Sequence, residues 1–222
     1  MLLPRHCPIC RSLGEAPCGA CLRQLEHAPL LLPPPGIDAA VALFAYVGVG
    51  REMITRLKYA NHRDGLPRLS SALAVAVVRA GMGPQQVTWV PTTPQRRRER
   101  GFDQAELLAR AVSHHLVALG IEAPCHRSLR RLDRGHQTGR DIVGRHAASF
   151  EPVASMPDRM LVVDDVRTTG SSLSASASAL RRGGALQVWA ATLAATPRAL
   201  PEGAYPAGDG ASTITPSDAP AG

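Results

Sequence analysis

The stretch MLVVDDVRTTGSS, at residues 160–172, decides the fold of this 222-residue chain. Its first four residues are apolar and predict a buried strand, and Asp164 and Asp165 stand where that strand is expected to stop. A turn rich in hydroxyls and glycine follows, and it opens a helix whose first amides have no backbone acceptor. The stretch therefore predicts a strand, a tight turn and a helix of an α/β domain.

The same turn predicts a binding site. Free N–H groups and the helix dipole both favour an anion at the start of a helix, so the turn can hold a phosphate. The neighbouring carboxylates of Asp164 and Asp165 can accept hydrogen bonds from adjacent hydroxyl groups. A sugar that carries a 5′-phosphate satisfies both halves of the pattern and is the expected ligand.

Two other interpretations fit this pattern less well. The Walker B strand of a nucleotide hydrolase requires a Gly-Lys-Ser/Thr loop, but Lys58 is the single lysine of the chain and Tyr59 follows it. A purely structural turn, in which Asp and Thr cap the helix, is common. Such a cap explains neither the acidic pair nor the repeated hydroxyl-glycine run, so the sugar-phosphate site is favoured.

The composition fits one α/β domain with a small appendage. The net charge of +7 comes from 25 basic residues against 18 acidic ones, and arginine supplies all of the basic residues except Lys58. Arginine suits phosphorylated small molecules as well as nucleic acids, so charge alone does not separate these partners. The sequence has no apolar stretch of membrane-spanning length and no signal-peptide core at its start, which predicts a cytoplasmic protein without membrane insertion.

Two Cys-x-x-Cys pairs near the start of the chain are formed by Cys7 with Cys10 and Cys18 with Cys21. Two such turns can close a tetrahedron around zinc, and in a cytoplasmic chain this spacing indicates a metal more often than disulfides. Rubredoxin-like iron is the alternative metal. We expect a structural zinc ribbon or knuckle over residues 1–36, with a boundary at the Pro-rich run 33–35.

The rest of the chain alternates strands and helices. Residues 37–197 are expected to form one α/β domain, and residues 198–222, which have little to bury, a disordered tail. Expected strands lie at residues 39–46, 87–90, 160–163 and 186–193, and expected helices at 50–59, 66–79, 102–119 and 171–182. The last strand-helix-strand unit predicts a parallel, doubly wound sheet flanked by helices. The polar, basic residues 127–150 are expected to form a mobile loop.

Residues 160–172 resemble, in composition, order and spacing, the phosphoribosyl pyrophosphate (PRPP) signature of type I phosphoribosyltransferases. The resemblance implies the fold of that family, with Asp164 and Asp165 as catalytic acids that contact the ribose hydroxyls. It implies that the 5′-phosphate is bound by a turn formed by Val166, Arg167, Thr168, Thr169, Gly170, Ser171 and Ser172. Mg²⁺ would accompany PRPP, since its oxygen ligands would come mostly from the substrate.

Other segments match further roles in that family. The resemblance implies a pyrophosphate loop after the strand at 87–90, formed by Pro91, Thr92 and Thr93 with Arg98 and Arg100. The flexible loop that closes over substrate would include Gln137, Thr138, Gly139 and Arg140. A plain surface loop is the alternative for that segment. Lys58 is retained where arginine is otherwise used, which indicates a role near a phosphate or a nucleophile.

The motifs together resemble the ComF branch of phosphoribosyltransferase-like proteins, described as competence or DNA-uptake accessory proteins with an N-terminal zinc ribbon. They are the cysteine pairs, RLKY at 56–59, VP at 90–91, RERGFDQAE at 98–106, QTG at 137–139 and the PRPP stretch. Asp103 departs from the branch, which has Asn there. Ala147 or Ala148 likewise stands where the branch is expected to have Asn.

These patterns support two hypotheses from different classes. The first is a PRPP-binding phosphoribosyltransferase that moves ribose 5-phosphate to an unidentified acceptor, with Mg²⁺ and release of pyrophosphate. The second is a non-catalytic adaptor whose zinc ribbon and arginines bind single-stranded DNA or a helicase partner, with the PRPP site as a sensor or relic. A homodimer is left open under both hypotheses.

Overall fold

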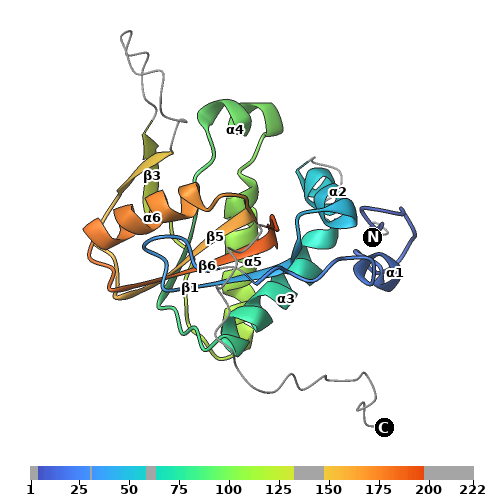
Figure 1. Ribbon diagram of the computed structural model, residues 1–222, viewed down its shortest axis with the longest axis horizontal. Helices are drawn as coiled ribbons and strands as arrows, with labels where there is room; N and C mark the ends of the chain where they lie inside the picture. Colours follow the sequence, from blue (N-terminus) through green and yellow to red (C-terminus); the bar gives the residue numbers. More distant parts are fainter. Residues whose placement is uncertain (1–4, 31, 59–63, 133–147, 198–222) are drawn as a thin grey trace, which may run out of the picture.

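One parallel sheet organises the chain. In the computed structural model, which describes residues 5–30, 32–58, 64–132 and 148–197, four strands pair in the order β1-β6-β5-β2 and all run parallel (Figure 1). The strands are β1 (Ala39–Ala45), β2 (Gln86–Trp89), β5 (Arg159–Arg167) and β6 (Gln187–Ala195). Because all four strands run the same way, their carboxyl ends meet at one edge of the sheet, which is where α/β folds bind ligands.

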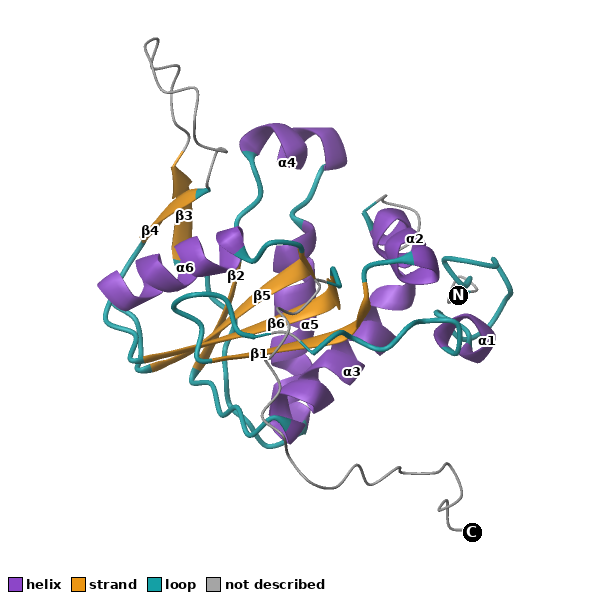
Figure 2. Cartoon of the chain, viewed as in Figure 1, coloured by secondary structure: helices purple, strands orange, loops and turns teal. Residues whose placement is uncertain are grey.

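Helices cover both faces of this sheet (Figure 2). On one face, α2 (Gly48–Leu57), α3 (Leu66–Arg79) and α5 (Gln104–Ala118) share a core cluster with the strands. On the other face, α6 (Ser171–Arg182) forms a second cluster. The predicted doubly wound parallel sheet flanked by helices is therefore confirmed.

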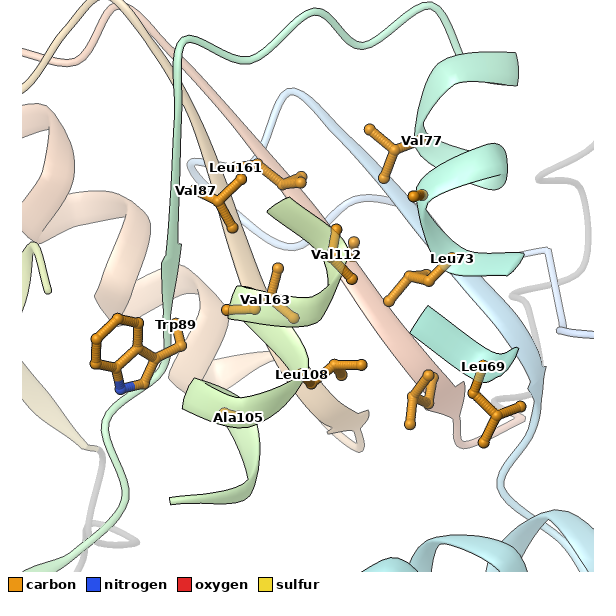
Figure 3. Close-up of a cluster of buried hydrophobic side chains, with 14 of the residues drawn as sticks. Leu69, Leu73, Val77, Val87, Trp89, Ala105, Leu108, Val112, Leu161 and Val163 are labelled. Atoms are coloured by element: carbon orange, nitrogen blue, oxygen red, sulfur yellow. The ribbon is translucent and has the colours of Figure 1, made fainter. Parts of the chain in front are cut away.

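The alternation of side chains along β5 builds both clusters. Leu161 and Val163 are fully buried in the cluster that also holds Leu108 of α5 (Figure 3). Met160 and Val162 point to the opposite face and pack with α6. Every position from 160 to 163 is therefore apolar because this strand is buried on both faces.

The start of α5 is set by Asp103. The carboxylate of Asp103 caps the helix, since its Oδ1 accepts the Ala105 amide at 3.1 Å while its own backbone remains extended. Gly101, with φ at 76°, ends the preceding helix and prevents an earlier start. The helix therefore begins two residues later than the apolar pattern of residues 102–119 predicts.

Two short strands lie at the ends of the segment 127–150, which the sequence predicts to be a loop. β3 (Leu129–Leu132) and β4 (Ser149–Pro152) pair antiparallel outside the main sheet, and β4 packs along α6. Leu129 and Phe150 are buried and anchor one strand each. The loop prediction is wrong for these ends. The segment has too few apolar residues to show the alternation that predicts a strand. The expected flexible-loop residues Gln137, Thr138, Gly139 and Arg140 lie outside the described residues.

The basic run after β2 forms the short helix α4 (Pro94–Arg100). The side chain of Thr93 caps it by accepting the Arg96 amide at 3.2 Å. No residue of α4 is buried, and the helix stands beyond the carboxyl edge of the sheet in Figure 1. Its arginines are therefore held at the surface beside that edge.

The N-terminal segment, with its short helix α1 (Gly19–Leu22), lies against the α/β domain. Arg68 of α3 donates to Glu15 Oε2 at 2.5 Å and to the Pro17 carbonyl at 2.9 Å. The Ala45 amide of β1 donates to the Glu26 carbonyl at 2.9 Å. The boundary after residue 36 remains a prediction, and the expected tail 198–222 lies outside the described residues. Across the described ranges, no helix is both long enough and apolar enough to cross a membrane.

Replacing Leu108 with alanine should lower the free energy of unfolding by about 2–5 kcal/mol. Leu108 is fully buried between α5 and the sheet, so its loss leaves a cavity in the larger cluster. Denaturation in urea measures the change. The matched control is Leu186→Ala, because that leucine is 66% exposed and should change stability by less than about 0.5 kcal/mol. Equal effects of the two substitutions would contradict the assigned core.

Candidate functional site

A cavity of about 350 Å³ opens where β2 and β5 end. The residues predicted from the sequence that line it are Lys58, Pro91, Thr92, Thr93, Arg100, Asp164, Asp165, Val166, Thr168 and Ser172. They come from three distant stretches of the chain: the end of α2, the loop after β2 with α4, and the end of β5 with the turn to α6. The parallel sheet is what brings these stretches to one edge.

The two acids lie within β5 and not beyond it. β5 pairs with β6 as far as Arg167, and Asp164 is in register with Thr192. Pairing with β2 stops earlier, at Val163. The prediction that the strand stops at the acids is therefore wrong on the β6 side and holds only on the β2 side. The early end of β2 leaves room beside the acids, and the cavity occupies it.

Opposing electrostatic effects act on the pKa of Asp164. Burial and the charge of Asp165 raise the pKa of Asp164 well above its ordinary value. The Asp165 amide, which donates to Asp164 Oδ1 at 2.9 Å, and the charge of Lys58 act in the other direction. Lys58 Nζ lies 3.2 Å from Asp165 Oδ2, and the two side chains are 25% and 16% exposed. The positive charge of Lys58, the single lysine of the chain, therefore offsets part of the negative charge of the acidic pair.

The β5–α6 turn is tight and opens directly into α6. Gly170 adopts a left-handed backbone with φ at 80°, and a Cβ there would lie 2.8 Å from Pro34 Cγ, so only glycine fits. The Ser171 amide donates to Thr169 Oγ1 at 3.3 Å, and the first backbone bond of the turn runs from the Ser174 amide to the Gly170 carbonyl. The amides of residues 172 and 173 lie in the first turn of the helix, where no helical carbonyl is placed to accept them. They are therefore available to a ligand.

Some of the predicted PRPP-binding residues do not line the cavity. Arg167 Nη2 donates to the Leu32 carbonyl at 2.5 Å, so its guanidinium faces the N-terminal segment. Thr169, Gly170 and Ser171 shape the turn without lining the cavity wall. Arg98 also lies outside the lining, whereas its neighbours Arg96 and Arg100 belong to it.

Asp103 fixes the loop after β2, a role that the sequence does not indicate. Its Oδ2 accepts the Thr92 amide at 3.0 Å while its Oδ1 caps α5, so one carboxylate joins the loop to the helix. Burial raises the pKa of Asp103, although the amides that it accepts act against the rise. The only sign of this role in the sequence is that Asp103 stands where the ComF-type motif has Asn. Arg131 was missed as well: it lines the cavity and donates to the Pro91 carbonyl at 3.3 Å.

The four paired cysteines converge near the N-terminus. Among the described residues, the sulfurs of Cys7, Cys10, Cys18 and Cys21 all lie within 4.8 Å of one another. Cys7 and Cys21 are buried while Cys10 is exposed, and the Cys10 and Cys18 sulfurs are 3.6 Å apart. The cluster could hold a metal ion, since sulfurs at these separations match the corners of a tetrahedral site.

Comparison with known proteins gives relatives with a shared name. The chain is 28% identical over 196 residues to the DNA utilization protein YhgH of Salmonella typhimurium, and 28% identical over 194 residues to the protein of that name in Escherichia coli K12. Each alignment covers 82% of this chain and 82% of the relative. The chain is a homologue of these DNA utilization proteins. The relatives bear out the ComF-type resemblance of the motifs. No model of a known protein family matches the chain.

Solved structures give partial overlaps. A purine phosphoribosyltransferase from Pyrococcus horikoshii superposes with a TM-score of 0.40 at 20% identity, covering 60% of this chain and 74% of that one. A hypothetical protein from Neisseria gonorrhoeae with bound ppGpp gives 0.39 at 19% identity, covering 63% and 74%. The fold assignment rests on the strand order and helix layers of this chain itself.

Replacing Asp164 with asparagine should stabilise the protein at pH 7. Because the folded pKa of Asp164 is raised, the folded state holds this proton more tightly than the unfolded chain does. The resulting stabilisation is complete below the ordinary Asp pKa and is lost as the pH rises through the folded pKa. Asparagine, which has no charge to desolvate, avoids that loss.

Thermal melts at pH 7 and at about pH 3.5 measure this effect. The Asn variant should melt higher at pH 7, by roughly 2–4 °C for each kcal/mol gained, and the gain should shrink at the lower pH. Asp158→Asn is the matched control, because that side chain is exposed and should change neither melt. A variant that melts below wild type at pH 7 would contradict the assigned environment.

Proposed function

We propose that the protein is a PRPP-binding phosphoribosyltransferase that transfers ribose 5-phosphate to an acceptor and releases pyrophosphate. One observation carries the proposal: a single cavity joins the Asp164–Asp165 pair to the amide-bearing turn that starts α6. A pentose with adjacent hydroxyls and a 5′-phosphate matches both walls of that cavity. The ComF-type resemblance and the DNA utilization relatives support a role in DNA uptake or use.

Each wall of the cavity has a distinct task in this proposal. Asp164 and Asp165 accept hydrogen bonds from the ribose hydroxyls, and the Thr168 and Ser172 side chains with the free amides of the turn bind the 5′-phosphate. Lys58 pairs with Asp165 and can turn to an incoming phosphate.

The loop after β2 would hold the leaving group. Thr92 and Thr93 line the cavity, and Arg96 and Arg100 lie beside them from α4. Their charges suit pyrophosphate, whose negative charge grows as the ribose develops oxocarbenium character. Asp103 contributes indirectly, since it accepts the Thr92 amide and so fixes the loop against α5.

The cavity also fits the Mg²⁺ that the resemblance implies. Asp164 and Asp165 offer hard oxygen ligands at the cavity wall, and PRPP itself carries most of the remaining ones. The chemistry that Mg²⁺ supplies is neutralisation of charge on the departing pyrophosphate.

We propose zinc as the metal of the four-cysteine cluster, with a structural role. The surrounding segment is too small for a core of its own and lies against α3 through Arg68, so metal binding would supply its folding energy. A cytoplasmic location, where thiols stay reduced, agrees with thiolate ligands.

A second function has its own support. α4 carries Arg96, Arg97, Arg98 and Arg100 and buries none of them, which suits contact with the phosphates of single-stranded DNA. A non-catalytic adaptor that binds DNA or a helicase partner would use this surface and keep the PRPP site as a sensor. The DNA utilization relatives agree with this candidate as well.

PRPP with Mg²⁺ should bind the wild-type protein saturably in isothermal titration. The double variant Asp164→Asn/Asp165→Asn should bind at least about 100-fold more weakly, because two charge-assisted hydrogen bonds are each worth about 1.5–3 kcal/mol. Asp158→Asn serves as the control and should bind like wild type. If PRPP does not bind wild type, or binds the double variant equally well, the proposed site is wrong.

The two functions are separated by turnover. Pyrophosphate release from PRPP is measured across a panel of nucleobases and amines. Release with one acceptor supports the transferase, whereas tight PRPP binding with no release across the panel favours the adaptor.

The purified chain should carry one zinc ion, measured by mass spectrometry of the metal content. Cys7→Ser/Cys21→Ser should lose the metal, because both thiols are buried in the cluster. The control is Cys125→Ser, since Cys125 is not part of the cluster and its replacement should leave the content unchanged. Iron in place of zinc, or zinc retained by the double variant, would contradict the assignment.

A further inference from the structure

A second cavity of about 360 Å³ borders the same loop after β2. It shares Pro91, Thr92, Asp103 and Arg131 with the first cavity but contains none of the β5–α6 turn. Its remaining lining consists of Trp89, Pro94, Arg97, Glu106, Arg110 and Arg127. The volume falls within the range of small-molecule sites, roughly 300–1,000 Å³. No role proposed for the first cavity accounts for this one.

Four arginines from four different segments meet at this cavity: Arg97 of α4, Arg110 of α5, Arg127 of the loop before β3, and Arg131 of β3. The two carboxylates in the lining do not balance them. Asp103 and Glu106 can offset at most two of the four positive charges, and both oxygens of Asp103 are held by backbone amides. Glu106 pairs with Arg110 of its own helix at 2.9 Å. Like charges gathered this closely favour the binding of an anion.

Two of these arginines are available to a ligand. Within the described part of the chain, the side chains of Arg97 and Arg127 make no hydrogen bond or ion pair, and both residues are exposed. The guanidinium of Arg110 lies 5.7 Å from the centre of the Trp89 ring, so its planar group is already oriented at the cavity wall. Guanidinium groups match the oxygens of a phosphate two at a time.

We propose that this second cavity binds a small phosphate-bearing molecule, held by Arg97, Arg110 and Arg127 over the Trp89 wall. The cavity has an apolar side formed by Trp89 and the two prolines, so the ligand can carry an apolar part as well as its phosphate. The site is separate from the PRPP cavity, and the inference does not rest on the proposed transferase function.

Trp89 provides a local reporter, because it lines this cavity, whereas Trp189, the one other tryptophan of the chain, lines neither cavity. Inorganic pyrophosphate is the probe. Titration into wild type should change the tryptophan fluorescence saturably, and Trp89→Phe should remove the change. Arg97→Gln/Arg127→Gln should weaken the response at least about 100-fold, since two charge-assisted hydrogen bonds are lost. Arg79→Gln, an exposed arginine that lines neither cavity, is the control.

A further variant separates the two cavities. Lys58→Gln/Arg100→Gln removes cations of the first cavity only and should leave the fluorescence response intact. Loss of the response in this variant, or its persistence in Arg97→Gln/Arg127→Gln, would overturn the proposal. So would an oligothymidylate that binds through Arg97 and Arg127 when pyrophosphate does not, because the surface would then serve a nucleic acid. Wild type that responds to pyrophosphate but fails to bind PRPP would refute the transferase and leave this site standing.

Discussion

The adjacent carboxylates of Asp164 and Asp165 place an electrostatic cost at the carboxyl edge of the sheet. Two like charges at the end of a strand buried on both faces raise the pKa of Asp164 and disfavour the folded state. Lys58, brought by the end of α2, offsets part of that cost at 3.2 Å from Asp165. A group at the sheet edge that destabilises the fold supports the binding site proposed there.

The scaffold explains how this site is built. β2 stops pairing at Val163, four residues before β5 ends at Arg167, so the acids keep one neighbouring strand and lose the other. The space left by β2 is walled by the loop that Asp103 ties to α5. The parallel sheet therefore supplies both an acidic strand and an adjacent loop at the same edge. Gly170, which no other residue could replace without meeting Pro34, closes the turn beneath them.

Much of this could be predicted because the signals are local. The strand, turn and helix at residues 160–172 follow from an unbroken apolar run and a glycine that must be left-handed, and the helix at 66–79 was found at its observed bounds. The rest depends on distant contacts. β3 and β4 form because Leu129 and Phe150 find a partner surface on α6, and no pattern within 127–150 records that surface. The tie between Asp103 and the Thr92 amide likewise exists only after β2 and α5 have packed.

A crystal structure with PRPP and Mg²⁺ would show whether the acidic pair and the β5–α6 turn hold a phosphorylated pentose together. We predict ribose hydroxyls within hydrogen-bonding distance of Asp164 and Asp165, the 5′-phosphate against the amides that open α6, and Lys58 moved from Asp165 toward the ligand. PRPP bound elsewhere on the chain, with the contact between Lys58 and Asp165 intact and the β5–α6 turn without phosphate, would contradict it.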